Sequence, residues 1–202
     1  IARYTSGNNR ELNAALEQFQ EARLFYRVLH SNAHSVPLGA DTSVRISKFL
    51  YIDVGLLLSA QGIPAQEVMN ANLELANRGS LAEQFVGQQL LYSKPEYVNP
   101  ELYYWHPPKS QGQAEVDFLY VSGNTIIPVE VKAGSTGTIK SLQSYVIKKQ
   151  ADLAVRVSSG KPSVNELVAK SAGKERDFKL INLPFYLVNR LASLLASGNA
   201  QE

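Results

Sequence analysis

Hydrophobic residues near the start of the chain recur with helical spacing and then with strand spacing. Residues 11–23 repeat apolar side chains every three or four positions, which predicts an amphipathic helix. Residues 24–29 and 44–54 are strand-like. The segment 31–41 between them contains Pro and Gly and predicts a loop. The chain therefore opens with a helix, a strand, a loop and a second strand.

The rest of the chain predicts helices alternating with strands. We expect helices at 65–77, 79–91, 139–149 and 184–195, and strands at 102–106, 114–121, 125–132, 153–157 and 178–182. This order predicts a mixed α/β fold of the α+β type, with helices on the faces of a mixed sheet. We assign residues 1–60 to the tail of a winged-helix-like or linker region and residues 61–202 to the main domain.

Composition excludes several classes of protein. The chain has 202 residues, of which 45% are hydrophobic and 19% charged, as in ordinary globular domains. It has no cysteine, which excludes disulfides, thiol nucleophiles and cysteine zinc sites. No apolar run approaches the roughly 20 residues that span a bilayer. Because the chain starts at Ile1 without a signal-peptide pattern, we interpret it as a piece of a longer, cytoplasmic protein.

The most informative local pattern is a predicted β-hairpin. Residues 114–121 and 125–132 flank Gly123-Asn124, a favoured two-residue connection. With that turn, counting outward places Asp117 opposite Glu130 and Glu115 opposite Lys132. Two carboxylates directly opposed across a sheet repel each other, so a chain selected for stability alone would avoid them. A divalent cation between them would remove the repulsion, and carboxylate oxygens suit Mg²⁺.

A third carboxylate comes from the helix before the hairpin. At about 100° per residue, Glu83 falls at the border of the apolar arc of helix 79–91. It can therefore point toward the edge of the sheet.

These residues resemble a known family. Glu83, Asp117 and the Glu130-Val-Lys132 triplet are similar to the motif of the PD-(D/E)XK nuclease superfamily. More closely, the chain resembles the domain of unknown function found C-terminal to AAA+ ATPase modules in bacterial and archaeal proteins. That resemblance rests on the segments Leu50-Tyr-Ile-Asp53-Val-Gly55, Gly79-Ser-Leu-Ala-Glu83, Tyr103-Tyr-Trp105-His, Glu115-Val-Asp117-Phe and Val129-Glu130-Val-Lys132. It implies a restriction-endonuclease-like αβββαβ core after a winged-helix-like remnant.

The resemblance implies Mg²⁺-dependent hydrolysis of a phosphodiester, with Mn²⁺ as a substitute ion. Asp117, Glu130 and Glu83 would hold the metal, and Lys132 would orient water or stabilise charge on phosphorus. ATP would bind only in the ATPase part of the full-length chain, because these residues contain no phosphate-binding loop. The spacing of Gln143 and Tyr145 departs from the helix motif of related nucleases.

The chain carries a net charge of only +2, but residues 134–176 are locally basic. Lys140, Lys148 and Lys149 in that stretch are candidate contacts to nucleic acid, with DNA as the first expectation and RNA as the second. A solvated surface would give the same charge pattern.

Other residues have structural interpretations. Trp105 fits the core, Asp53 fits a turn or helix cap, and His106 is either structural or close to the substrate. His30 and His34 are a weak metal pair.

Three functions fit these patterns. The first is a nuclease domain of a larger ATPase, the second a noncatalytic module that binds nucleic acid or positions the ATPase, and the third a protein-interaction domain whose charges are incidental.

Overall fold

The computed structural model describes residues 9–64, 66–67, 75–93, 97, 100–108, 110, 112–135, 137–171 and 173–198. The helices are α1 (Asn9–Glu21), α2 (Val54–Ala60), α4 (Leu75–Tyr92), α5 (Lys140–Lys149) and α6 (Leu191–Gly198), with short 3₁₀ helices η1 (Leu38–Asp41) and η3 (Phe185–Arg190). The strands are β1 (Phe25–Ser31), β2 (Thr42–Tyr51), β3 (Leu102–Trp105), β4 (Val116–Ser122), β5 (Thr125–Val131), β6 (Leu153–Ser158), β7 (Ser163–Ser171) and β8 (Lys174–Pro184).

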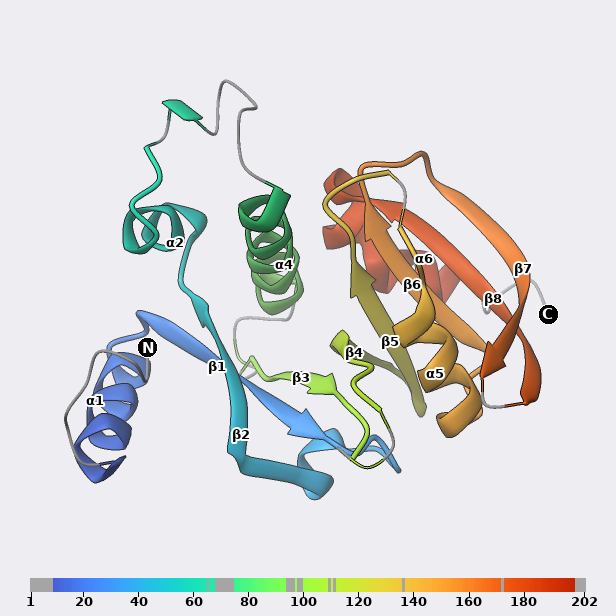
Figure 1. Cartoon of the computed structure of the whole chain (residues 1–202), viewed down its shortest axis with the longest axis horizontal. Helices are drawn as coiled ribbons and strands as arrows, with labels where there is room; N and C mark the ends of the chain where they lie inside the picture. Colours follow the sequence, from blue (N-terminus) through green and yellow to red (C-terminus); the bar gives the residue numbers. More distant parts are fainter. Residues whose placement is uncertain are drawn as a thin grey trace.

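All of these strands form one mixed sheet, in the order β2-β1-β3-β4-β5-β6-β8-β7 (Figure 1). Strands β3, β4 and β5 form an antiparallel meander at its centre. The β5-α5-β6 unit adds a parallel crossover, and β8 continues parallel to β6. Strand β1 joins the meander by pairing in parallel with β3.

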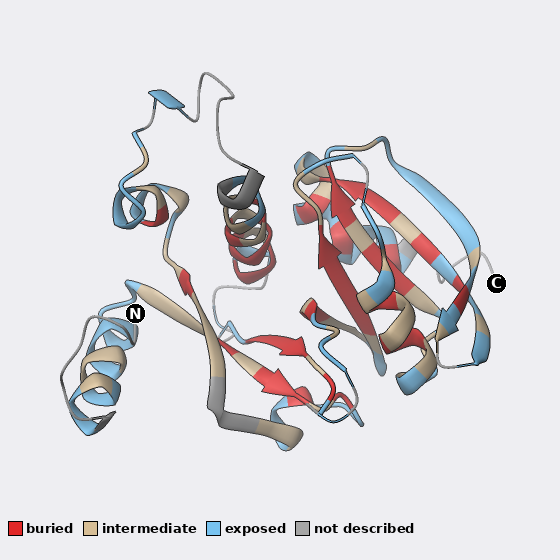
Figure 2. Ribbon diagram, viewed as in Figure 1, coloured by how far each residue is buried: buried red, intermediate tan, exposed pale blue. Residues whose placement is uncertain are grey.

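Helices cover both faces of this sheet, so the fold has three layers. On one face, α4 and the η3–α6 segment pack on β4, β5 and β6 around fully buried Phe118, Val129 and Val155. On the other face, α5 buries Leu142 and Tyr145 against the same strands. Figure 2 shows β5 and β6 buried almost throughout, whereas α1 and the outer edge of β7 face solvent.

The predicted order of elements is confirmed for most of the chain. Helices 11–23, 79–91 and 139–149 correspond to α1, α4 and α5. The predicted strands correspond to β1 to β6 and to part of β8. The mixed α/β class with helices on the sheet faces is therefore confirmed at the level of architecture.

Three local predictions differ from the structure. Strand β7 lies in a segment without a predicted element, because its solvent-facing edge position leaves few buried residues to give a hydrophobic alternation. Helix α2 is only seven residues long and was also missed. The predicted helix 184–195 divides into η3 and α6. The predicted helix 65–77 lies largely outside the described residues.

The sheet continues across the predicted boundary at residue 60. Strands β1 and β2 come from the segment that we assigned to a winged-helix-like tail or linker, yet they extend the same sheet through β3. Residues 25–51 therefore help to build the architecture that carries the site. The division into two domains at residue 60 stays a prediction.

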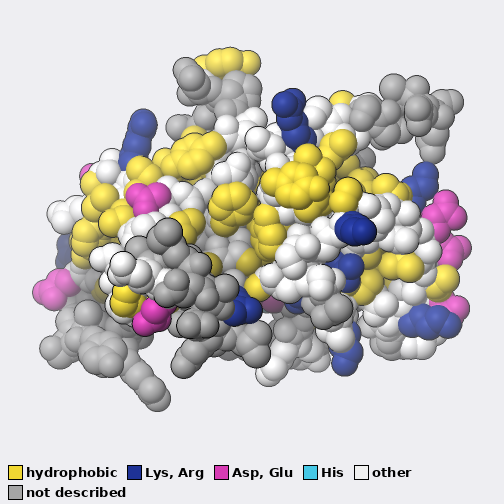
Figure 3. All heavy atoms as spheres, turned by 90° about the horizontal axis from the view of Figure 1, so that it is seen from above, with side chains coloured by type: hydrophobic (Ala, Val, Ile, Leu, Met, Phe, Trp, Pro, Cys, Tyr) yellow, Lys and Arg dark blue, Asp and Glu magenta, His cyan; other side chains and the backbone are white. Residues whose placement is uncertain are grey.

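The described residues include no helix that is both long and apolar enough to cross a membrane. Hydrophobic side chains do gather in a band on the face seen in Figure 3, between scattered lysine and arginine side chains. The large hydrophobic side chains exposed on the molecule include Tyr186 and Leu194, from η3 and α6.

Two glycines of α4 should respond oppositely to alanine. A Cβ at Gly87 would lie 2.3 Å from Leu50 Cδ1 and 3.0 Å from Phe118 Cζ, whereas a Cβ at Gly79 would meet nothing within 4 Å. Overpacking costs about 1–3 kcal/mol and alanine gains about 1 kcal/mol of helix propensity. We expect G87A to lower and G79A to raise the urea unfolding midpoint. Equal midpoints would contradict the packing of α4 on the sheet.

Candidate active site

The β4–β5 hairpin has the predicted register. Ser122 pairs with Thr125, and Leu119 pairs with Pro128. Gly123 has a φ of +57°, which suits the first central position of a type II′ turn. Phe118 and Val129 form the last pair, so the next residues outward on the two strands are Asp117 and Glu130.

The Asp117 carboxylate joins the two strands beyond their last pair. Its Oδ2 accepts a hydrogen bond of 2.7 Å from the backbone N–H of Val131. A side-chain acceptor thus replaces a backbone carbonyl for this N–H of β5. Asp117 therefore has a structural role, and this bond fixes its carboxylate beside the end of β5.

The Glu130 carboxylate is buried, with 4% of the residue exposed. One of its oxygens, Oε1, accepts a hydrogen bond of 2.7 Å from Lys132 Nζ. The other, Oε2, is buried without a hydrogen-bond partner. A buried carboxylate oxygen with no donor is costly, so this atom has the surroundings expected of a ligand position.

A lysine from β2 gathers two further carboxylates. Lys48 Nζ lies 2.9 Å from Glu83 Oε1 and 2.5 Å from Glu115 Oε1. It also lies 4.9 Å from the centre of the Tyr104 ring. Glu83 projects from α4 toward the sheet edge, as its helical angle predicts, and it is close enough to influence the ionisation of Asp117. The carboxylate cluster is hereafter the set Glu83, Glu115, Asp117 and Glu130, with Lys48 and Lys132.

The carboxylate cluster changes the acidity of its members. Burial, and then the charges of Glu130 and Glu83, raise the pKa of Asp117 to about 7. Burial also raises the pKa of Glu130, against the opposing effects of Lys132 and Lys48. For Lys48, burial alone would lower the pKa, but the carboxylates of Glu83, Glu115 and Asp117 raise it. Shifts of this kind are typical of functional sites, although structural ion-pair networks produce them as well.

The donor chemistry suits a hard divalent cation, because the cluster offers only carboxylate oxygens and one of them is buried without a partner. The lysines now satisfy several of these oxygens. Within the described part of the chain, no group of three or more histidine, cysteine, aspartate or glutamate side chains is already arranged to hold a metal ion.

A family profile described as a domain of unknown function, DUF4143, matches residues 78–185, more than half of the chain. The chain belongs to the DUF4143 family. This family is typically found with AAA-type ATPases. The matched DUF4143 segment contains the four carboxylates and Lys132 but not Lys48. No curated protein and no solved structure matches the chain.

The other residues of this DUF4143 chain that the sequence singled out lie outside the carboxylate cluster. Lys140 is exposed at the start of α5, whereas Lys148 and Lys149 lie at its end. Asp53 is the N-cap of α2, where its Oδ1 accepts from Leu56 N at 2.8 Å. Trp105 is a core residue with 2% exposure, which confirms its prediction.

Two of the three histidines lie against each other, and the third contacts an aspartate. His30 Nε2 lies 3.2 Å from the backbone oxygen of His106, and the two rings are 4.2 Å apart. His34 Nδ1 instead lies 2.5 Å from Asp41 Oδ2. His30 and His34 therefore face different partners, and the weak metal pair that we considered does not form between them.

Sequence reasoning missed Lys48 and gave Glu115 the wrong partner. The hairpin count paired Glu115 with Lys132, but in the structure Glu115 binds Lys48, and Lys132 binds Glu130. Lys48 lies 35 positions before Glu83 in the sequence, so no local pattern connects them. The predicted strand 44–54 carries two basic residues, Arg45 and Lys48, so nothing in the sequence singles out Lys48.

Removing the charge of Asp117 should stabilise the fold at neutral pH. The pKa of Asp117 is raised on folding, so its ionisation destabilises the folded state. This destabilisation is absent below the unfolded pKa near 4 and complete above about 7. We expect Asp117→Asn, whose Oδ1 still accepts from Val131 N–H, to be more stable than wild type by about 1–3 kcal/mol at pH 8.

The measurement is urea unfolding of both proteins in EDTA at pH 4, 6 and 8. The advantage of Asp117→Asn should grow as the pH rises through this window. A variant that is less stable than wild type at pH 8 would contradict the burial of opposed charges.

Proposed function

We propose that this chain is a metal-dependent phosphodiester hydrolase module of the PD-(D/E)XK type. The observation that carries the proposal is the proximity of the Asp117 and Glu130 carboxylates just beyond the last pair of the β4–β5 hairpin, with Lys132 bound to Glu130. A carboxylate pair beside a lysine is the combination needed to hold a divalent cation and a phosphate together. The central antiparallel strands flanked by α4 and α5 are compatible with the αβββαβ core of that superfamily.

Asp117 and Glu130 would hold Mg²⁺ or Mn²⁺, with Glu83 as a further ligand. Bound there, the cation would polarise the scissile phosphate and lower the pKa of a coordinated water. The protein contributes the arrangement of its own side chains. The Val131 N–H fixes the Asp117 carboxylate, and Lys132 fixes that of Glu130 while bringing a positive charge for the developing charge on phosphorus.

The raised pKa values of the carboxylates support a cation site. Ionising two buried, neighbouring carboxylates is unfavourable, so some of their protons remain near neutral pH. A divalent cation favours the ionised forms and would release those protons on binding. Cation binding and proton release are therefore coupled in this proposal.

The polymer substrate is nucleic acid, with DNA first and RNA second, and the basic residues of α5 are its proposed contacts. The association of the family with AAA-type ATPases supports a role for the chain as a module of an ATP-dependent protein. In that arrangement ATP binds to the ATPase part, and the protein acts in the cytoplasm.

Cleavage should depend on Mg²⁺ and on the cluster. We expect wild type to cut members of a panel of single- and double-stranded DNA and RNA with Mg²⁺ or Mn²⁺. Glu130→Gln and Lys132→Ala should each lower the rate by about 10²-fold or more, as expected for removing one group that stabilises the transition state. The assay uses gel-resolved products, with and without ATP and the full-length chain.

Matched controls are Glu166→Gln and Lys161→Ala, the same changes at exposed positions outside the cluster. Both controls should cut as fast as wild type. Wild-type rates in Glu130→Gln or Lys132→Ala would show that the cutting activity does not come from this site.

One observation favours a second function, a noncatalytic module that binds nucleic acid or positions the ATPase. Lys48 already lies between Glu83 and Glu115, and Lys132 already binds Glu130. Two internal ammonium groups thus compensate part of the negative charge that a metal would otherwise neutralise.

Lys48→Met separates the two functions. Removing a half-buried partner leaves partly uncompensated carboxylates, so the variant should lose about 1–3 kcal/mol of stability in EDTA. If the cluster is a cation site, Mg²⁺ should restore much of that stability, measured by thermal unfolding with Mg²⁺ and with an equal ionic strength of NaCl. Equal unfolding temperatures in the two salts would favour the noncatalytic module.

A further inference from the structure

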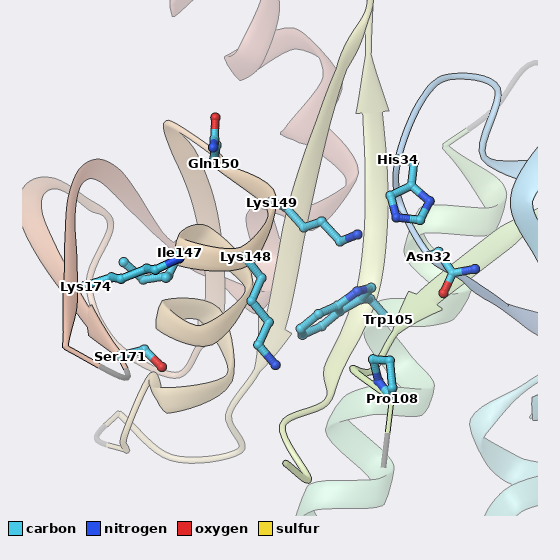
Figure 4. Close-up of a pocket in the computed structure, with 10 residues that line it drawn as sticks. All are labelled: Asn32, His34, Trp105, Pro108, Ile147, Lys148, Lys149, Gln150, Ser171 and Lys174. Atoms are coloured by element: carbon cyan, nitrogen blue, oxygen red, sulfur yellow. The ribbon is translucent and has the colours of Figure 1, made fainter. Parts of the chain in front are cut away.

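A cavity of about 540 Å³ lies between the end of α5 and the loop that follows β1. Its volume is in the range of small-molecule sites, roughly 300–1,000 Å³. Figure 4 shows Lys148 and Lys149 extending from the end of α5 toward Trp105 and the residues opposite. The cavity is lined by Asn32, His34, Trp105, Pro108, Ile147, Lys148, Lys149, Gln150, Ser171 and Lys174.

The lining is basic. Lys148 and Lys149 are adjacent on α5, and Lys174 comes from the start of β8. Among the described residues that line this cavity, none is an aspartate or glutamate. Three ammonium groups around one concave surface produce a positive potential that attracts an anion.

The carboxylate of Asp41 contacts two lining residues but does not itself line the cavity. Its oxygens accept from Asn32 Nδ2 at 2.8 Å and contact His34 Nδ1 at 2.5 Å. Asp41 therefore orients two polar side chains of the cavity wall. Burial and the neighbouring Lys148 lower the pKa of Lys149, with Asp41 opposing them. A bound anion would favour the charged form of Lys149.

We propose that this cavity binds the phosphate of a nucleotide. Lysine is a compact positive charge that binds phosphate without a fixed geometry. The apolar side of the cavity, with Pro108 and Ile147, would accept the sugar or the edge of the base. Trp105 is only 2% exposed and has Lys148 Nζ 5.9 Å from its ring centre, so it presents no open face for base stacking. The phosphate therefore dominates recognition, and base identity matters little.

This site adds a defined phosphate pocket to the nucleic-acid contacts proposed for α5 and rests on that part of the proposed function, but it does not depend on the hydrolase. None of its lining residues belongs to the carboxylate cluster, and binding needs neither a metal nor cleavage. The phosphate has two sources, a nucleic-acid strand or a free nucleotide. The two share the same chemistry at the cavity and differ in how many phosphates they bring near α5.

The test uses Trp105, the single tryptophan of the chain, as a reporter in the cavity wall. Its fluorescence is titrated in EDTA with inorganic phosphate, with ADP, and with a short oligothymidine carrying a 5′-phosphate or a 5′-hydroxyl. Titration calorimetry with the same compounds gives affinities that do not depend on the environment of the indole.

We expect saturable binding that weakens from 50 to 200 mM salt, and a Lys148→Ala/Lys149→Ala double variant that binds about tenfold or more weakly. For the oligonucleotide, the slope of log K against log salt concentration should be smaller in magnitude for this double variant by about 1.4, or about 0.7 for each lost contact to a single strand. Lys148→Arg/Lys149→Arg should retain binding. The matched control Lys161→Ala/Lys179→Ala removes the same charge from exposed positions outside the cavity and should bind like wild type.

These titrations are made in EDTA and involve no cleavage, so failure of the hydrolase proposal would leave this one standing. Tighter binding of the oligonucleotide identifies a strand as the source of the phosphate, and tighter binding of ADP identifies a free nucleotide. Unchanged affinity in Lys148→Ala/Lys149→Ala, or no binding of any of these compounds, would overturn the proposal.

Discussion

A backbone amide that donates to a carboxylate holds the centre of this molecule in register. The bond from Val131 N–H to Asp117 lies where the β4–β5 ladder ends, and it places the acid beside the buried Glu130. A slip of one residue would exchange the faces of every side chain on β5, moving Val129 and Val131 away from the core beneath α4 and placing polar groups there. The hydrophobic packing of the hairpin and the position of its acids are thus set by the same constraint.

Much of this arrangement could be predicted because it is local. The Gly123-Asn124 turn fixes a register over fewer than twenty residues, and helical periodicity alone turns Glu83 toward the sheet edge. What escaped prediction depends on distant packing. Lys48 reaches the acids only because β1 inserts beside β3, a parallel pairing between strands more than seventy positions apart. Strand β7 was missed because an edge strand buries little of its surface.

The carboxylate cluster and the basic cavity have opposite electrostatic character in one small fold. In the cluster, repulsion between buried acids is partly compensated by two internal lysines. At the cavity, the carboxylate of Asp41 is already engaged by Asn32 and His34 and stays outside the lining. The first arrangement favours a cation and the second an anion. A phosphate polymer that brings its own divalent ions would satisfy both, although each site can be tested without the other.

The source of Lys48 has a consequence for where this domain begins. The segment shared with the family starts at residue 78, whereas the ammonium group that neutralises Glu83 and Glu115 comes from residue 48. The segment that matches the family and the set of residues that neutralises its carboxylates therefore begin at different positions of the chain. A fragment cut at the homology boundary would keep all four acids and lose half of their internal counterions. The β1–β2 ribbon is in this sense an electrostatic part of the domain that follows it.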